Sequence, residues 1–447
     1  MGHIAVILLL LGVALVSLAY PWVGAVSGYL FSVLTPQAIW YWDFAGLRPV
    51  LWIMLPTGFG LLLGIIRRTV DLRVLWNRRN LCLLILWLFS VISYYFGPYT
   101  NVPGPYRFED AAFRFDDLNK IFVLYFMASA CIEGERRLKA LYLVMIGAGL
   151  YLVYWANHQY LTGNFYGRLN GPSTPDGTGM YSDQNAFAML FVVVQPFIWY
   201  WGASFTRPVL KWACWLAIPF CWHAVFLTGS RGGLLGLAAT ILLIVMRSKR
   251  RILGLALIPA FIFVFAWQGG SVMKSRADTI SEYNQDASAA DRIDSWHAAI
   301  QMILDHPLTG VGLASYGPAF PHYSPKKPRE AHNTFLQIAA ESGVVAGLMY
   351  LLVVADGLRS LWRNGNRLRR AGAEVRGNFE FMLNEAVLIS FTGLVVCSLF
   401  LSLQDFEVFY CLVVMTNGAL LLAERRQAVE GESAVAPVVT RAAVRTS

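Results

Sequence analysis

The chain has 447 residues, of which 57% are hydrophobic and only 14% are charged. Soluble domains carry roughly 25% charged residues, so this composition excludes an ordinary soluble globular protein. The 36 Lys and Arg residues exceed the 27 Asp and Glu residues, which gives a formal net charge of +9. Because the basic residues gather in alternate connections between apolar runs, the excess indicates orientation in a membrane, and we expect no nucleic-acid partner.

Long apolar runs recur along the whole chain. A run of about 18 or more apolar residues can cross roughly 30 Å of hydrocarbon, whereas barrel strands would show short alternating segments. The predicted fold class is therefore all-α, a polytopic integral membrane protein with about 12 transmembrane helices. After residue 45 the runs lie near residues 49–66, 80–97, 118–132, 138–158, 184–203, 209–228, 232–246, 252–268, 334–357, 382–403 and 408–423.

The first 45 residues contain two apolar stretches separated by Pro21. The connection at residues 67–80 is rich in arginine, so the positive-inside rule predicts that it is cytoplasmic and that the span at 49–66 runs inward. We expect one full span plus a re-entrant or interfacial segment before residue 45. Two full spans with an outside N-terminus are the alternative.

The pattern of spans and connections divides the chain into four parts. The longest connection faces outward and is where chemistry is expected, and the polar C-terminal end is expected to be disordered and cytoplasmic. The parts are residues 1–268 with transmembrane helices and short loops, the large outward-facing loop at 269–333, transmembrane helices at 334–424, and the tail at 425–447.

An amphipathic helix is predicted inside the large loop. Ile293, Trp296 and Ile300 follow helical spacing within residues 291–304, and Pro307 ends the run. Such a helix lies on the membrane surface or caps the bundle. Gly310 and Gly312 then provide a flexible turn before the chain enters the membrane again near residue 333.

Three arginines on the outward face are candidates for binding an anion. Ser230 is a natural N-cap and places Arg231 in the first turn of a helix, where a cation is unfavourable unless it and the free N–H groups hold a phosphate. The alternative for Arg231 is a snorkelling interface residue. Arg168 and Arg292 emerge on the same side; each alone resembles an ordinary loop charge, but together the three guanidiniums can bind a diphosphate.

His332 is the candidate base. It stands at the N-terminal edge of an inward-running helix, whose dipole is expected to lower the pKa of the imidazole and keep it neutral. A capping or hydrogen-bonded interface histidine is the alternative. Asn333, Ser230 and Arg48 are possible supporting residues.

No metal or cofactor is expected from the sequence. The histidines lack a metal-ligand spacing such as HExxH. The acidic pairs Glu109-Asp110 and Asp116-Asp117 can hold a divalent cation, although a solvated acidic loop is the preferred interpretation.

Four segments together resemble the O-antigen ligase family over about residues 165–350. Each segment is weak alone, but their order and spacing are specific to this family. They are Leu227-Thr228-Gly229-Ser230-Arg231-Gly232-Gly233, Arg292 with Trp296, His306-Pro307-Leu308-Thr309-Gly310-Val311-Gly312, and His332-Asn333-Thr334-Phe335-Leu336 with Glu341-Ser342-Gly343.

The resemblance implies a metal-independent inverting glycosyltransferase with a GT-C-like fold in the bacterial inner membrane. Such a ligase moves a glycan from undecaprenyl diphosphate to the lipid A core of lipopolysaccharide on the periplasmic side, so loop 269–333 would be periplasmic. The family's histidine maps onto His332 and its arginines onto Arg231, Arg292 and Arg168. The arginines would bind the diphosphate and stabilise its developing charge, while His332 would take the proton of the acceptor hydroxyl.

Other functions share this membrane layout. An O-antigen polymerase uses the same donor chemistry, and residues 34–45 faintly resemble protein O-glycosylation ligases associated with exosortase systems. A lipid-glycan flippase, from a different class, would place charged residues near the middle of its spans. Because the candidate residues here cluster at one surface, an enzyme is favoured over a carrier.

Overall fold

The structure is a computed structural model of the whole chain. It describes residues 2–102, 110–164, 167–175, 177, 179–248, 259, 261–263, 287–374 and 377–435. The regular elements in these residues are helices, with no strand among them. The all-α prediction is confirmed.

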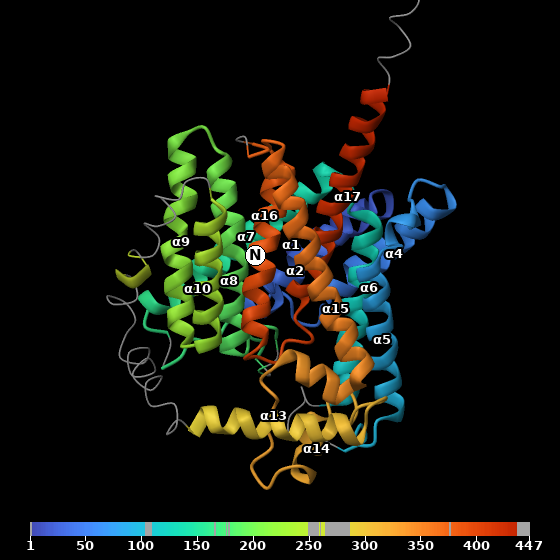
Figure 1. Cartoon of the computed structure of the whole chain (residues 1–447), viewed down its shortest axis with the longest axis vertical. Coiled ribbons are helices and arrows are strands. Elements are labelled where there is room, and N and C mark those ends of the chain that lie inside the picture. Colours follow the sequence, from blue (N-terminus) through green and yellow to red (C-terminus); the bar gives the residue numbers. More distant parts are fainter. Residues whose placement is uncertain are drawn as a thin grey trace, which may run out of the picture.

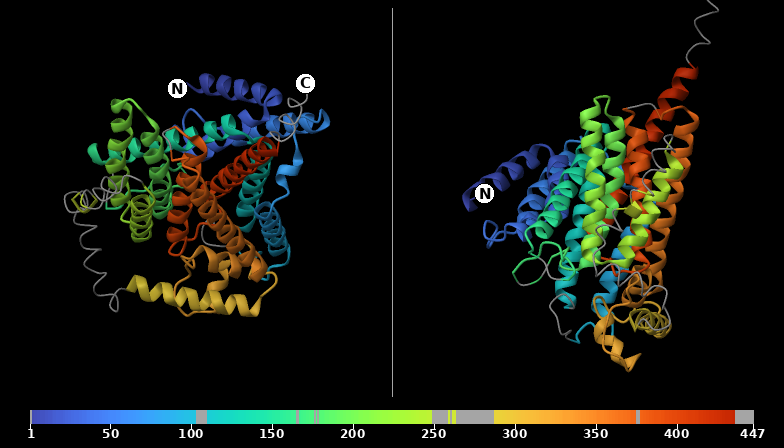
Figure 2. Two further views of the ribbon diagram at one scale, coloured as in Figure 1. Left: turned by 45° about the horizontal axis from the view of Figure 1, so that its top comes forward. Right: turned by 90° about the vertical axis from the view of Figure 1, so that its left-hand side faces the viewer.

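Eight helices in the described part of the chain are long and apolar enough to cross a membrane. They stand side by side as a bundle (Figures 1 and 2). Each coincides with a predicted apolar run, although several extend beyond it. They are α4 (Pro49–Ile66), α5 (Arg78–Phe96), α7 (Glu135–Leu161), α8 (Gln184–Ser204), α9 (Pro208–Thr228), α15 (Thr334–Arg370), α16 (Phe379–Ser398) and α17 (Glu407–Val435).

Four further helices of the bundle are shorter or more polar. α1 (His3–Ala19) and α10 (Arg231–Arg247) have 17 residues each, and α2 (Pro21–Leu34) has 14. α6 (Ala111–Cys131) begins seven residues before its predicted run, and these seven residues include three charged ones, Arg114, Asp116 and Asp117. Most of the predicted span at 252–268 lies outside the described residues, so the expected total of about 12 spans stays a prediction.

The centre of the bundle is formed by α8 and α16. Their apolar windows are 89% and 83% buried, against 28% for α4 and α5. Large apolar residues of α8 such as Phe187, Phe191 and Phe197 are fully buried, because α8 is covered by other helices, whereas the apolar surface of α4 is mostly left exposed by the protein. The site described below lies at one end of this core.

The described part of the predicted outward loop begins with α13 (Ala287–Asp305), which lies across one end of the bundle (Figure 1). It ends before Pro307, as the sequence predicts. With α14 (Tyr316–Ala319) and the 3-10 helix η4 (Phe320–His322), it encloses a small separate core around Met302, Tyr316 and Phe320. Residues 269–286 of the predicted loop lie outside the described residues.

Helix α15 is broken at Gly343, whose φ of 86° is left-handed. The break leaves the carbonyls of Ala340 and Glu341 to accept hydrogen bonds from the N–H groups of Val311 (2.8 Å) and Gly312 (3.2 Å). A Cβ atom at Gly343 would lie 2.3 Å from the carbonyl oxygen of Leu308. The glycine is therefore required for residues 307–312 to pack against the broken helix.

The C-terminal tail differs from its prediction. Helix α17 continues to Val435, so residues 425–435, which we expected to begin a disordered tail, are helical. Residues 423–428 consist of Ala, Glu, Arg and Gln, which favour helix strongly enough to extend the apolar part of α17. This end of α17 projects from the side of the bundle opposite α13 (Figure 1).

Candidate active site

His332 lies in a short connection whose backbone is fixed on both sides. The N–H of Ala331 donates to Oε1 of Gln337 (2.8 Å), and the carbonyl of Ala331 accepts a hydrogen bond from Nε1 of Trp296 on α13 (3.0 Å). Asn333 caps α15 by accepting from the N–H groups of Phe335 (3.1 Å) and Leu336 (3.2 Å). Between them, His332 has a left-handed φ of 48°.

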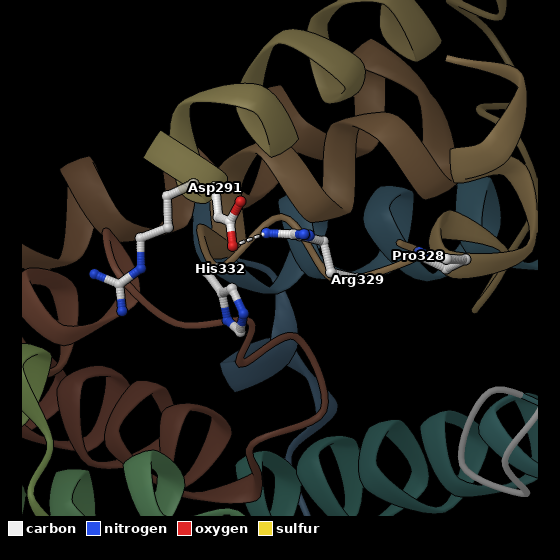
Figure 3. A pocket seen from close by; sticks show the side chains of 5 residues that line it. Asp291, Pro328, Arg329 and His332 are labelled. Atoms are coloured by element: carbon white, nitrogen blue, oxygen red, sulfur yellow. Dashed lines mark ion pairs between the residues drawn. The ribbon is translucent and has the colours of Figure 1, made fainter. Parts of the chain in front are cut away.

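A cavity of about 290 Å³ opens beside His332. Asp291 and Arg292 come from α13, whereas Pro328, Arg329 and His332 come from the connection that precedes α15. Figure 3 shows the His332 ring next to the ion pair between Arg329 and Asp291, in which Nη1 and Oδ2 are 2.6 Å apart. The structure therefore brings two predicted residues, Arg292 and His332, together in one cavity.

Burial is the largest cause that lowers the pKa of His332 below its ordinary value. The positive charges of Arg292 and Arg329 lower it as well, whereas the carboxylates of Glu330 and Asp183 raise it. We expected the dipole of the following helix to have this effect; the direction agrees, but the leading cause is desolvation of the imidazolium. A histidine with a lowered pKa is neutral at neutral pH and can accept a proton.

Arg168 and Arg231 both lie at the turn between α9 and α10. Nε of Arg168 donates to the carbonyl of Thr228 (2.8 Å), the last residue of α9. Ser230 caps α10 by accepting from the N–H of Gly233 (3.1 Å), so Arg231 is the first helical residue, as predicted. Arg231 is half-buried and Ser230 is fully buried.

One segment, residues 400–403, connects this turn to His332. A Cβ atom at Gly232 would lie 3.3 Å from Cβ of Phe400, so the start of α10 packs against the segment. On its other side, Oγ1 of Thr334 donates to the carbonyl of Leu401 (2.7 Å) and accepts from the N–H of Leu403 (3.1 Å). Segment 400–403 therefore contacts both Gly232, which follows Arg231, and Thr334, which lies two residues after His332.

The remaining predicted residues have simpler positions. Asn333 and Ser230 are helix caps, which is the structural role that their residue types favour. Arg48 is an exposed residue that directly precedes α4 and does not line the cavity. Asp110 caps α6, and Asp116 and Asp117 form ion pairs with Lys120, while Glu109 lies outside the described residues.

Two cavity residues, Asp291 and Arg329, were missed by sequence reasoning. Asp291 directly precedes Arg292, and Arg329 ends a basic run, Lys326-Lys327-Pro328-Arg329, just before His332. That basic run is a sequence signal that could have identified Arg329 as a candidate. The ion pair of Arg329 with Asp291 could not be predicted from sequence, because it depends on how α13 lies against the connection.

Comparison with known families adds independent information. Residues 212–351 match the family model described as O-Antigen ligase. The match covers less than half of the chain, and over these residues the chain is similar to that family. The match confirms the resemblance, and the matched region extends from α9 into α15 and includes Arg231, Arg292 and His332. No curated protein matches the chain. This match supports a function of the O-antigen ligase or polymerase type in general, and the eight apolar helices in the described residues are consistent with a membrane protein.

Proposed function

We propose that this protein is an O-antigen ligase that transfers a glycan from undecaprenyl diphosphate to the lipid A core. The transfer takes place at the end of the bundle that carries α13, which we assign to the periplasmic face of a bacterial inner membrane. The observation that carries the proposal is His332, half-buried with a lowered pKa, in one cavity with Arg292 inside the matched domain.

His332 acts as the general base in this proposal. Its neutral imidazole takes the proton of the acceptor hydroxyl as the oxygen forms a bond to the anomeric carbon of the glycan. The bond from that carbon to the diphosphate oxygen breaks at the same time. Attack on the face opposite the leaving group inverts the configuration.

The arginines act on the leaving group. Arg292 lines the cavity with His332, while Arg231 and Arg168 both lie at the turn between α9 and α10, which packs against residues 400–403. One guanidinium can donate two parallel hydrogen bonds to phosphate oxygens. Its positive charge stabilises the negative charge that develops on the departing diphosphate. The lipid chain of the donor lies among the surrounding membrane lipids, with its head group at this end.

Charged residues inside the spans support an enzyme over a flippase. Asp356 on α15 forms an ion pair with Arg79, and Glu385 on α16 forms one with Arg247. Glu341 accepts a hydrogen bond from Gln337 (2.7 Å). Asp356 and Glu385 thus link different helices and Glu341 is bonded within α15, whereas a carrier needs charges that face its transport path.

A transfer assay tests the proposal. Purified protein is given undecaprenyl-diphosphate glycan and lipid A core in the presence of a chelator, and wild type is compared with His332→Ala. We expect chelator-resistant ligated product from wild type and its loss in the variant, with donor binding and folding retained. Normal ligation by His332→Ala would contradict the assigned role.

The product distinguishes the alternatives. Elongated lipid-linked glycan without ligated lipid A core would identify a polymerase. Consumption of donor only in the presence of a protein acceptor would identify a protein O-glycosylation ligase. Movement of donor across the bilayer without covalent change would identify a flippase.

A further inference from the structure

Arg329 lines the cavity but takes no part in the proposed transfer mechanism. Its Nη1 contacts Oδ2 of Asp291 at 2.6 Å, and its Nε donates to the carbonyl of Lys327 (3.2 Å). The side chains of Arg329 and Asp291 are 23% and 38% exposed, so the pair faces the cavity and is not sealed in protein. A partly exposed ion pair is weak and can exchange one partner for another.

Asp291 has a second cation within reach. Nζ of Lys326 is 3.7 Å from Oδ1 of Asp291 and also forms an ion pair with Asp294. If Arg329 leaves, Lys326 can still neutralise the Asp291 carboxylate. The ion pairs therefore allow Arg329 to move without leaving an isolated anion in the wall of the cavity.

The charges in the cavity favour an anionic ligand only if Arg329 changes partner. Asp291 is the acid among the five lining residues, and its carboxylate opposes a diphosphate while Arg329 is engaged with it. Arg292 follows Asp291 on α13 and lines the same cavity. With Arg329 turned toward the ligand, two guanidiniums from two different elements face one diphosphate.

We propose that Arg329 is a donor-binding residue that exchanges its ion pair with Asp291 for the diphosphate of the lipid-linked donor, while Lys326 retains Asp291. This inference rests on the proposed function, because it assumes a diphosphate ligand in this cavity. It adds Arg329 to the predicted arginines, and it assigns Asp291 as the residue that holds Arg329 until the donor binds.

Equilibrium binding of undecaprenyl diphosphate to the full chain in lipid nanodiscs tests the exchange. We expect Arg329→Gln to weaken binding about 10-fold or more, because a charge-assisted phosphate contact is lost. Asp291→Asn should tighten binding, since Arg329 no longer has to leave an ion pair. The double variant should bind as weakly as Arg329→Gln alone.

Lys327→Gln is the matched control. Lys327 is exposed, belongs to the same basic run and does not line the cavity. Its replacement removes one positive charge from the same connection and should leave affinity unchanged. Undecaprenyl monophosphate serves as the ligand control, and the effect of Arg329→Gln should be smaller for it.

Several results would overturn the inference. If Asp291→Asn restores binding to Arg329→Gln, Arg329 only neutralises Asp291. An equal loss in Lys327→Gln would mean that the general field of the loop is responsible. If Arg329→Gln binds undecaprenyl diphosphate as tightly as wild type does, the inference is wrong but the proposed function stands. If wild type binds no undecaprenyl diphosphate, both the inference and the proposed function are wrong. Should Arg329→Gln not fold, unchanged affinity in Asp291→Asn still overturns the exchange.

Discussion

Helix α10 begins and ends with an arginine, and the two have opposite surroundings. Arg247, the last residue, is 5% exposed. Its Nε and Nη2 donate to Oε2 and Oε1 of the fully buried Glu385, each at 2.7 Å. Its guanidinium also lies 4.4 Å from the ring centre of Trp362. Arg231, the first residue, is half-buried at the turn beside Arg168, roughly 24 Å away by helical rise.

The difference in burial between the two ends of α10 distinguishes a structural ion cluster from a candidate ligand-binding site. Glu385 also accepts from Arg369 (2.6 Å), so two arginines from α10 and α15 are tied to one carboxylate on α16. At the other end of the bundle, Arg292 and Arg329 line an open cavity, and Arg231 is the first residue of α10. A closed cluster holds helices together, whereas a partly exposed group of arginines can still take a ligand.

The closed cluster is expected to give the largest effect on stability. Glu385→Gln leaves buried Arg247 without its carboxylate partner and removes one of the two partners of the partly exposed Arg369, so it should reduce the free energy of unfolding by about 3–5 kcal/mol. Asp291→Asn, in the open cavity, should leave the unfolding midpoint nearly unchanged. Thermal unfolding in detergent measures both, and equal losses would contradict the comparison.

Variants of the two ends of α10 should separate activity from stability. Arg231→Gln should lower kcat/KM by about 10- to 100-fold, because a charged hydrogen bond to the diphosphate contributes about 1.5–3 kcal/mol. Its unfolding midpoint should stay close to that of wild type. Arg247→Gln should reverse the pattern, with lower stability and normal activity per folded molecule. A stability loss without an activity loss in Arg231→Gln would remove Arg231 from the site.

The break in α15 should affect the site end of the molecule. Gly343→Ala places a Cβ atom 2.3 Å from the carbonyl oxygen of Leu308 at a left-handed φ, which should cost about 1–3 kcal/mol and lower transfer. Gly147→Ala in α7 is the control, because a Cβ atom there meets nothing within 4 Å. It should be neutral or slightly stabilising. Equal behaviour of the two variants would show that the break is not needed.

The smallest expected effects are shifts in the pH profile. Because burial lowers the pKa of His332, transfer should rise with pH through a value below 6.5 as the imidazole loses its proton. Glu330 raises this pKa, so Glu330→Gln should move the acid limb to lower pH. Arg329→Gln should move it to higher pH, since Arg329 lowers the pKa. Shifts of kcat/KM with the same sign in both variants would show that the acid limb does not report His332.

Local chemistry explains why much of the fold was predictable. Ser230 and Asn333 accept hydrogen bonds at the starts of α10 and α15, and Pro307 follows the end of α13. Each signal depends on residues within one turn, so it can be read from sequence. The order of the apolar helices followed from their composition in the same way.

Packing between distant segments explains what was missed. Glycine is common in transmembrane helices, so Gly343 gave no sign of a break until Leu308 was found against it. The ion pair between Asp291 and Arg329 likewise needs α13 to lie beside the connection to α15. The extra turns at the start of α6 were missed because its charged residues there read as a loop.

The connection that holds His332 has a consequence for turnover. Both backbone polar groups of Ala331 are already bonded within the protein, to Gln337 and Trp296, and Asn333 caps the next helix. The conformational entropy of this connection is therefore lost once, during folding, and not each time a substrate binds. More of the interaction energy with each lipid-linked glycan then remains for orienting the reacting atoms.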